Sequence, residues 1–465
     1  MEITRKTIGQ MLNETAEKYP NGEALIHTDL SARYTYSLLQ WEVDRVARGL
    51  MNAGIEKGDR VALWAPNIPE WIVAMLAISK TGALFVPVDS GSGPEDLRSV
   101  LSQSEARAII LARGLEAEEY VDMFFSVRDQ VPSVEHAFVI ATESYPETVP
   151  WTELAASGED AATGILRKRE QRIKPEDPVA IMYTPGTKGM AKGVVLDHLG
   201  LINKCMASTR RQGLTHEDRL CLFLPLFHMI GNTCVALSGL LIGATIVMPC
   251  LAFDPPKVLQ AIHKQKCTAV YATPSMMIGL LDHPVFQKKR FATVKKGTMG
   301  GTPCPMDLMK RLVQDVGVAR ITVAYGITEA SSWITMTYPE DPLELLATTI
   351  GAPLEGNEVK IVHGVTGKDL KRNQPGELCV RGLLMKKYYR MPRLTSSVID
   401  KEGWFHTGDM GEIDDRGYVK IRGRITDRAA GRIQKAKPAK NAVKVLKKAG
   451  KLHGSQKASA GKKIT

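Results

Sequence analysis

Residues 183–194 read Tyr-Thr-Pro-Gly-Thr-Lys-Gly-Met-Ala-Lys-Gly-Val, and they continue an apolar run that begins at Val179. The apolar run predicts a short buried β-strand that leads into a loop. Glycine lets backbone N–H groups turn toward an anion without an obstructing Cβ, while threonine and lysine add donors and positive charge. A strand that enters such a loop is typical of a phosphate cradle, with a glycine-rich surface turn as the alternative. The Walker pattern is excluded, because no Gly-Lys-Ser/Thr sequence opens a helix here.

On both sides of this loop the sequence alternates between strand-like and helix-like segments. Such alternation is typical of βαβ units and predicts an α/β fold with parallel sheets. Short apolar runs separated by turn signals follow, and they predict a β-rich subdomain over about residues 350–422. The expected helices are 38–54, 68–81, 94–103, 255–265, 274–282 and 305–316; the expected strands are 59–64, 83–88, 106–111, 136–141, 267–271, 294–299 and 320–325; residues 166–178 are expected to form a surface connection.

The composition is that of a soluble globular protein, because 44% of the 465 residues are hydrophobic and 24% are charged. This length is enough for two or three domains. The seven cysteines are scattered without a CxxC pair, so their pattern predicts neither a zinc site nor a disulfide framework. Reduced cysteines, together with a polar N-terminus that lacks an apolar signal core, predict a cytoplasmic protein.

An uncharged stretch over residues 221–253 is the candidate for a membrane span. Its strongly apolar part, residues 234–248, is shorter than the roughly 20 residues that a spanning helix needs. We therefore expect a buried helix, a turn at Gly243 and a buried strand over residues 244–248.

The net charge of +11 is concentrated near the end of the chain, because residues 428–465 hold twelve Lys and Arg and no Asp or Glu. The first 427 residues are consequently close to neutral. Such a tail could bind nucleic acid or an anionic membrane surface through charge alone. Specific nucleic-acid binding is not expected, since the tail lacks interleaved aromatic side chains.

Two more predicted strands end in residues suited to ligand binding, and ligands of α/β sheets bind beyond the carboxyl ends of strands. Residues 299–303 read Met-Gly-Gly-Thr-Pro, and their small side chains let a flat ring or an acyl group approach the backbone. Residues 325–329 read Tyr-Gly-Ile-Thr-Glu. Tyr325 offers a ring on which adenine could stack, and Glu329 offers the oxygen ligands that Mg²⁺ prefers. Taken alone, a capped helix start explains this last motif equally well.

Three further motifs complete the pattern. They are Leu-Pro-Leu-Phe-His at 224–228, Gly-Trp-Phe-His-Thr-Gly-Asp at 403–409, and Gly-Arg-Ile-Thr-Asp at 423–427. In this order, the motifs of the chain resemble those of the adenylate-forming superfamily, which includes acyl-CoA synthetases, aryl-CoA ligases, luciferases and peptide-synthetase adenylation domains. The sequence at 227–229 and 387–389 is most similar to that of medium- and long-chain fatty acyl-CoA synthetases.

The resemblance implies a large N-terminal domain over residues 1–422, a hinge at 423–427 and, in place of a small α+β domain, a basic remnant tail over 428–465. We expect this truncated tail to be disordered, since 38 residues rich in Ala, Lys and Gly cannot build a core. Residues 430–435 resemble the segment that carries the family's catalytic lysine, with Arg432 at the lysine position.

The implied activity is ATP-dependent activation of a carboxylic acid to an acyl-adenylate, followed by transfer to coenzyme A, with Mg²⁺ as the cofactor. Asp409 would accept the ribose hydroxyls, and His228 would border the carboxylate pocket unless it is a satisfied core residue. The implied catalytic residues are Lys192, Glu329 and Arg432; the nucleotide-binding residues are Thr184, Gly186, Thr187, Lys188, Gly189, Gly301, Thr302, Pro303, Tyr325, Gly326, Thr328, Asp409 and Arg424; the substrate-binding residues are His228 and Gly300; the metal ligands are Thr184 and Glu329.

The phosphate loop departs from the family at three positions, where Pro185, Lys188 and Ala191 replace Ser, Thr and Pro. Pro185 removes a hydroxyl and a backbone N–H, and losing one preorganised donor costs roughly 10²–10³-fold in rate. Slow adenylation is therefore expected. The alternatives are a non-catalytic relative that binds nucleotide or acyl groups, and an interaction protein that acts through its basic tail.

Overall fold

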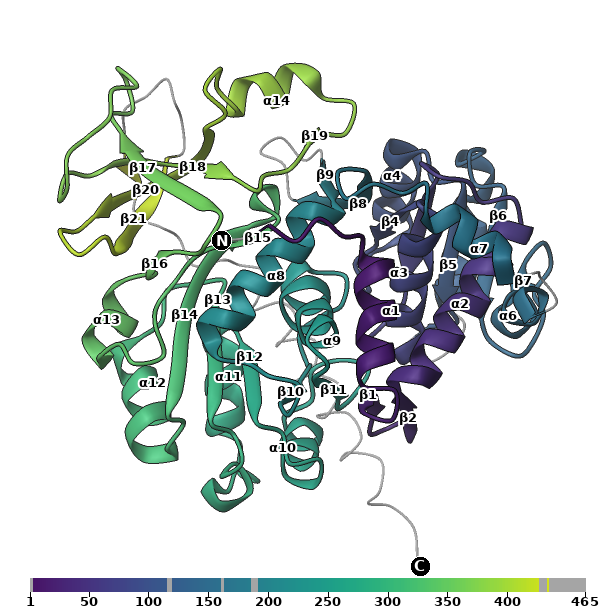
Figure 1. Ribbon diagram of the computed structural model, residues 1–465, viewed down its shortest axis with the longest axis horizontal. Helices are drawn as coiled ribbons and strands as arrows, with labels where there is room; N and C mark the ends of the chain where they lie inside the picture. The colour runs from purple at the N-terminus through teal and green to yellow at the C-terminus, as the bar shows by residue number, and fades with distance from the viewer. Residues whose placement is uncertain (1–2, 115–118, 160–162, 185–190, 426–432, 435–465) are drawn as a thin grey trace, which may run out of the picture.

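The computed structural model describes residues 3–114, 119–159, 163–184, 191–425 and 433–434. Within these ranges the strands form three sheets of nine, eight and five members. Helices pack against the two larger sheets, and the smallest sheet lies to one side, next to β15 and β16 (Figure 1). The predicted α/β fold with a β-rich subdomain is confirmed.

The nine-stranded sheet has the order β16-β15-β14-β13-β12-β10-β11-β1-β2. Its interior pairs are parallel, while the pairs at both edges are antiparallel. Its strands are β1 (Glu23–His27), β2 (Ala32–Thr35), β10 (Arg219–Cys221), β11 (Thr245–Met248), β12 (Ala269–Ala272), β13 (Lys296–Gly300), β14 (Arg320–Ile327), β15 (Ser332–Met336) and β16 (Ala352–Pro353).

The eight-stranded sheet has the order β19-β9-β8-β4-β3-β5-β6-β7. Strands β8 and β9 pair in antiparallel fashion, and β19 adds antiparallel to β9, so this edge departs from the expected parallel pattern. Its strands are β3 (Arg60–Trp64), β4 (Leu84–Pro87), β5 (Ala108–Ala112), β6 (His136–Ile140), β7 (Val149–Pro150), β8 (Pro178–Thr184), β9 (Lys192–Asp197) and β19 (Lys387–Tyr388).

The five-stranded sheet is antiparallel throughout and forms the β-rich subdomain. A small core that includes Ala330, Ile334, Leu378 and Val419 joins it to the segment around β15. Its strands are β17 (Asn357–Val362), β18 (Gly376–Gly382), β20 (Phe405–Ile413), β21 (Val419–Ile425) and β22 (Ile433–Gln434).

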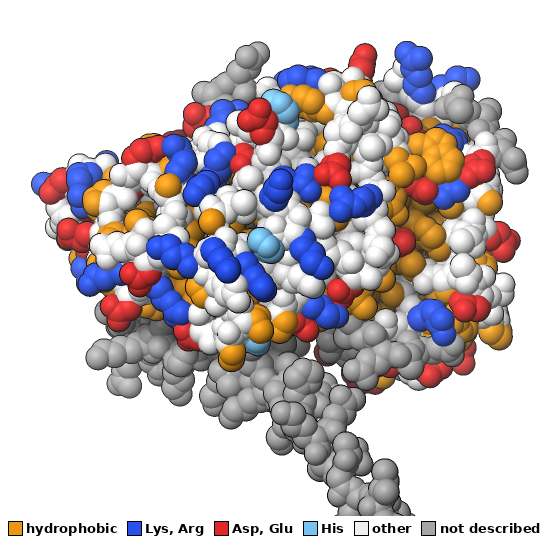
Figure 2. Space-filling model, turned by 90° about the horizontal axis from the view of Figure 1, so that it is seen from below, with side chains coloured by type: hydrophobic (Ala, Val, Ile, Leu, Met, Phe, Trp, Pro, Cys, Tyr) orange, Lys and Arg blue, Asp and Glu red, His pale blue; other side chains and the backbone are white. Residues whose placement is uncertain are grey.

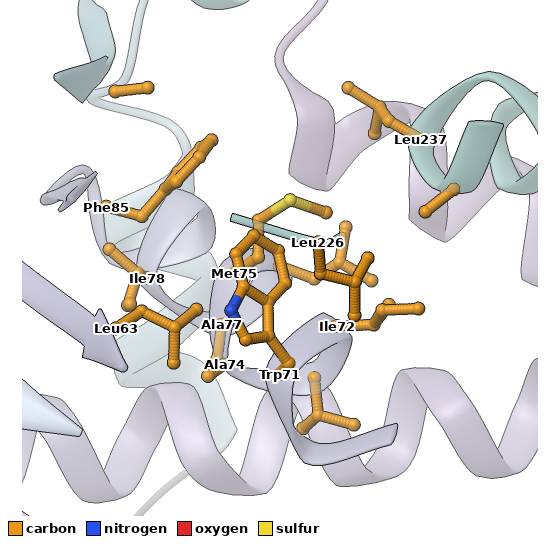
Figure 3. Close-up of a cluster of buried hydrophobic side chains, with 14 of the residues drawn as sticks. Leu63, Trp71, Ile72, Ala74, Met75, Ala77, Ile78, Phe85, Leu226 and Leu237 are labelled. Atoms are coloured by element: carbon orange, nitrogen blue, oxygen red, sulfur yellow. The ribbon is translucent and has the colours of Figure 1, made fainter. Parts of the chain in front are cut away.

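Helix α3 (Pro69–Thr81) lies in the main core, because it is apolar on all sides and nearly every residue in it is buried. Figure 3 shows Trp71 and Met75 of this helix among Phe85 of β4 and Leu226 and Leu237 of a distant segment. The other helices are α1 (Ile8–Lys18), α2 (Tyr36–Asn52), α4 (Pro94–Ser104), α5 (Glu119–Val127), α6 (Trp151–Glu159), α7 (Thr163–Glu170), α8 (His198–Gln212), α9 (Ser238–Leu241), α10 (Pro255–Lys264), α11 (Pro274–Leu281), α12 (Met306–Lys310), α13 (Leu343–Thr348) and α14 (Pro392–Val398), with π-helices at Ile230–Leu237 and Arg311–Val316 and 3₁₀ turns at Arg128–Gln130, Lys288–Arg290 and Thr328–Ala330.

The expected surface connection over 166–178 is wrong in its first part, because α7 continues to Glu170. Helix α7 faces the protein interior here because Glu170 pairs with the buried ammonium of Lys80. Lys80, at the end of α3, has a side chain only 1% exposed, and its Nζ lies 3.4 Å from Glu170 Oε1 and forms an ion pair with Asp44. A buried ammonium requires such partners, so the carboxylate of α7 turns inward rather than toward solvent.

No helix in the described part of the chain is long and apolar enough to cross a membrane. The uncharged stretch at 221–253 instead forms the π-helix, α9 and strand β11, with Gly243 at a φ of 86° between the last two. All seven cysteines are buried. On the face seen in Figure 2, basic side chains lie among acidic and uncharged ones, as the near-neutral charge of the first 427 residues predicts.

Candidate active site

The predicted phosphate loop lies between two antiparallel strands, since Thr184 at the end of β8 is paired with Lys192 at the start of β9. Residues 185–191 connect these ends, and 185–190, which include the predicted ligands Gly186, Thr187, Lys188 and Gly189, lie outside the described residues. The hydroxyl of Thr184 is buried and has no hydrogen-bond partner within the described ranges. Buried hydroxyls normally have a partner, so this one is available to a ligand.

Lys192 and Glu329, which are 137 positions apart in the sequence, meet through Tyr388. The Tyr388 hydroxyl donates to Glu329 Oε1 at 2.7 Å, and Lys192 Nζ lies 3.3 Å from that hydroxyl and 3.6 Å from the same carboxylate oxygen. Burial raises the pKa of Tyr388 far above its ordinary value, and the charge of Glu329 adds to this, so the hydroxyl remains a donor. The ammonium also lies 4.9 Å from the Tyr388 ring centroid, within cation–π range.

Backbone hydrogen bonds fix this cluster. The N–H of Met385 donates to the carbonyl of Glu329 at 2.7 Å, and the N–H of Tyr389 donates to the carbonyl of Gly193 at 2.7 Å. The segment 385–389 therefore bridges the 3₁₀ turn after β14 and strand β9. Tyr388 was not predicted as a site residue from the sequence, although the run at 387–389 supplied part of the resemblance.

A second cluster joins the nine-stranded sheet to the five-stranded sheet. The Tyr325 hydroxyl donates to Asp409 Oδ2, and Arg424 Nε lies 3.1 Å from Asp409 Oδ1. Asp409 and Arg424 face each other because they are paired residues of β20 and β21. Burial raises the pKa of Asp409, while the hydrogen bond from Tyr325 and the charge of Arg424 act in the opposite direction. Burial, followed by the charge of Asp409, raises the pKa of Tyr325.

The two clusters share one electrostatic environment. The charge of Glu329 contributes to raising the pKa of Asp409. Conversely, the charge of Arg424 acts to lower the pKa of Tyr388, against the larger effect of burial. Three predicted residues, Glu329, Asp409 and Arg424, and the unpredicted Tyr388 are thus close enough to affect one another.

The glycines at the strand ends serve different purposes. A Cβ on Gly300 would lie 2.8 Å from Trp333 Cη2, and a Cβ on Gly326 would overlap the carbonyl oxygen of Ser332. Both glycines are therefore required for packing against β15. Gly301 has a φ of 85°, in the left-handed region that favours glycine. Thr302 and Pro303 beside it are exposed, and Thr328 begins the 3₁₀ turn that carries Glu329.

The side chain of His228 is exposed, so the alternative of a satisfied core histidine is wrong. The surrounding protein nevertheless desolvates the imidazole and lowers its pKa, as expected for a side chain in a recess. Its segment lies beside the end of β13, because a Cβ on Gly301 would be 3.9 Å from Ile230 Cδ1 and 3.5 Å from Thr273 Cγ2. The π-helix that begins at Ile230 is a local irregularity common at functional sites.

Arg424 is the last predicted site residue within the described part of the chain. Residues 426–432 and 435–465 lie outside it, so Arg432, most of the basic tail and the end of the hinge stay predictions. The described residues of the predicted hinge, 423–425, complete strand β21.

Comparison with known proteins identifies the family of the chain. The AMP-binding enzyme family matches residues 12–389. YngI of Bacillus subtilis (strain 168) is 34% identical over 440 residues, which cover 92% of this chain and 80% of YngI. The mitochondrial medium-chain acyl-CoA ligase ACSF2 of Rattus norvegicus is 30% identical over 444 residues, which cover 91% of this chain and 72% of that protein.

Among solved structures, the N-terminal domain of FACL13 from Mycobacterium tuberculosis superposes with a TM-score of 0.76 at 27% identity, covering 90% of this chain and 99% of that domain. ATP-bound MatB from Rhodopseudomonas palustris has a TM-score of 0.78 at 24% identity over 90% of this chain and 79% of its own, a likeness that shows the fold. The chain belongs to the AMP-binding enzyme family, and its relatives place it among the acid–thiol ligases of the acyl-CoA synthetase type.

Proposed function

We propose that this protein uses ATP to convert a medium- or long-chain fatty acid to an acyl-adenylate, and then transfers the acyl group to coenzyme A. The observation that carries the proposal is the convergence of Lys192 at the start of β9, Glu329 in the turn after β14 and Asp409 within β20. Each is positioned by a tyrosine or by a backbone hydrogen bond. The medium-chain substrate of the ACSF2 relatives supports the acyl class.

The nucleotide would be held from two sides. Asp409 would accept the ribose hydroxyls through the lone pairs that its bonds to Tyr325 and Arg424 leave open. The Tyr325 ring, fixed at its hydroxyl end, would provide a stacking surface for adenine. Arg424 has a side chain 70% exposed, so its guanidinium is free to reach a phosphate.

The donor set also fits a magnesium ion. Glu329 provides carboxylate oxygens, and Thr184 provides a buried hydroxyl with no hydrogen-bond partner in the described ranges. Mg²⁺ prefers such oxygen ligands and supplies charge neutralisation at phosphate oxygens when bound. The ammonium of Lys192 lies at the rim of the phosphate loop, where it would stabilise negative charge that develops on the phosphoryl oxygens.

Both steps of the reaction are substitutions without a covalent enzyme intermediate. A carboxylate oxygen of the fatty acid forms a bond to the α-phosphorus of ATP, and the bond to pyrophosphate breaks. The CoA thiolate then attacks the acyl carbon, and AMP leaves with the electron pair. The chain's own contribution is positioning and charge stabilisation, which is sufficient for phosphoryl chemistry of this kind.

Pyrophosphate release measured over a series of fatty acids of increasing length tests the proposal. We expect ATP- and acid-dependent release, and thioester formation when CoA is added. Lys192→Ala should lower the adenylation rate by roughly 10²–10³-fold. Lys386→Ala, on the same edge but paired with Asp197 at 3.4 Å, is the matched control and should leave the rate unchanged. Absence of pyrophosphate release with every acid would refute the proposal.

A second candidate function is binding of ATP and fatty acid without turnover. It is favoured by Pro185, which lacks the hydroxyl and N–H that the family's serine contributes to the phosphate loop. Calorimetry that detects ATP binding, combined with no pyrophosphate release, would support this candidate. Restoring release with Pro185→Ser would then assign the lost activity to this position.

A further inference from the structure

Three side chains with metal-binding atoms meet in the five-stranded sheet. Glu377 and Cys379 belong to β18 and His406 belongs to β20, where Cys379 is paired directly opposite His406. Their donor atoms, one from each residue, all lie within 4.8 Å of one another. His406 Nδ1 is 2.9 Å from Glu377 Oε2 and 3.4 Å from Cys379 Sγ.

These separations suit a tetrahedral zinc ion. Zn²⁺ binds thiolate sulfur at about 2.3 Å and imidazole nitrogen or carboxylate oxygen at about 2.0–2.2 Å. Tetrahedral angles then place the sulfur and nitrogen ligands roughly 3.6 Å apart, close to the 3.4 Å between Cys379 and His406. Nitrogen and oxygen ligands would be roughly 3.4 Å apart. Glu377 therefore needs to move only slightly from its hydrogen-bonded position.

The other side of the imidazole is oriented as in known metal sites. His406 Nε2 lies 3.7 Å from Asp400 Oδ2. A histidine that binds metal through one ring nitrogen usually donates its other N–H to a carboxylate or carbonyl. Asp400 is itself held, because its Oδ1 accepts the backbone N–H groups of Glu402 and Trp404, each at 2.9 Å.

The surroundings favour a closed site with limited solvent access. Cys379 is 0% exposed, and Glu377 is 5% exposed. Trp404 packs against Cys379. The His406 side chain is 19% exposed, which leaves this side open to an arriving ion and to a water ligand in the fourth position. Buried carboxylate and imidazole groups together with a thiol are the donor set that borderline-soft metals select.

We propose that Glu377, Cys379 and His406 bind a divalent transition-metal ion, Zn²⁺ rather than Mg²⁺, at a structural site distinct from Glu329. The ion would link β18 to β20 three residues before Asp409, which lies within β20. Glu377 already contacts the residue before Asp409, since its Oε1 accepts the N–H of Gly408 at 3.3 Å.

The sequence predicted no zinc site, because it contains no CxxC pair. The proposed ligands instead come from two strands, and Cys379 and His406 are 27 positions apart. Strand pairing brings them together, so no local spacing rule could have identified them.

The test uses the full chain, stripped of metal by dialysis against a chelator and titrated with Co²⁺ as a spectroscopic probe. We expect saturation near one equivalent, with tetrahedral d–d bands and a thiolate-to-cobalt charge-transfer band that Zn²⁺ abolishes and Mg²⁺ does not. Cys379→Ser and His406→Gln should remove the charge-transfer and d–d bands, respectively. Cys250→Ser, at another buried cysteine, is the matched control and should keep both. Asp400→Asn should weaken binding by roughly 10–100-fold.

The titration of the unaltered chain decides the question even if a variant fails to fold. The proposal is overturned if the unaltered chain shows no charge-transfer band. It is also overturned if Cys379→Ser retains the band at full intensity, or if Mg²⁺ displaces the cobalt as readily as Zn²⁺ does.

Discussion

Replacing Tyr388 with phenylalanine isolates the contact that joins Lys192 to Glu329. The change keeps the buried ring, which is 1% exposed, and removes only the hydroxyl that donates to Glu329 at 2.7 Å. A hydrogen bond to an ionised group contributes about 1.5–3 kcal/mol, equivalent to roughly 10- to 150-fold in rate if it is realised in the transition state. We expect the lower part of this range, because Lys192 Nζ remains 3.6 Å from the carboxylate.

The assay is pyrophosphate release as a function of Mg²⁺ concentration. If the hydroxyl positions Glu329 as a metal ligand, Tyr388→Phe should lower kcat/KM for ATP and raise the Mg²⁺ concentration needed for half-maximal rate. A purely structural loss would lower the rate at every Mg²⁺ concentration alike. Tyr389→Phe, at the neighbouring position, is the control and should change neither quantity. An unchanged Mg²⁺ dependence in Tyr388→Phe would refute the role assigned to this hydroxyl.

Three further predictions follow from charges and close contacts. Asp409→Asn should weaken ATP binding in calorimetry while maintaining or raising the melting temperature. Burial raises the pKa of Asp409, so the ionised carboxylate lowers the stability of the folded protein as the pH rises. A lower melting temperature with unchanged ATP affinity would contradict this. Burial lowers the pKa of His198 from 6.5 to about 3. Its neutral form therefore contributes fully to the free energy of unfolding above pH 6.5, and this contribution declines at lower pH by at most about 1.4 kcal/mol per pH unit. His198→Asn should flatten the pH dependence of the free energy of unfolding between pH 6.5 and pH 3, measured by urea unfolding. Gly326→Ala should destabilise the protein by about 1–3 kcal/mol in urea unfolding through overlap with Ser332, whereas Gly364→Ala, where a Cβ meets nothing within 4 Å, should have little effect.

Many helices and strands of the larger sheets were predictable because their apolar residues recur with a clear period, whereas α1, α5, α8, β1 and β2 were not predicted. The predicted helix over 68–81 corresponds to α3, Pro69–Thr81, and the predicted strand over 59–64 to β3, Arg60–Trp64. Helix α7 was missed because its charged residues are typical of a surface loop. Its position depends on an ion pair with Lys80, about 90 residues earlier, which no local pattern reveals.

The site residues likewise include some that local sequence motifs reveal and one, Tyr388, that they do not. Lys192, Glu329 and Asp409 belong to motifs that can be read locally, and the structure brings them into one electrostatic environment. Tyr388 was not assigned, because β19 has only two residues and its partners lie 59 and 196 positions away. A two-residue strand has no periodicity to detect.

The arrangement around β19 also explains why these distant residues can be positioned accurately. Strand β19 pairs with β9, and the preceding Met385 donates its backbone N–H to the carbonyl of Glu329. The same short segment thus aligns the strand that begins with Lys192 and the turn that carries Glu329. Because these bonds use the backbone, substitutions of side chains on the segment leave them in place, and the Tyr388 hydroxyl adds a side-chain contact to Glu329 and Lys192. Met385→Pro would remove the backbone N–H that donates to the carbonyl of Glu329. It should therefore lower the adenylation rate far more than Met385→Leu, although both substitutions remove the same thioether.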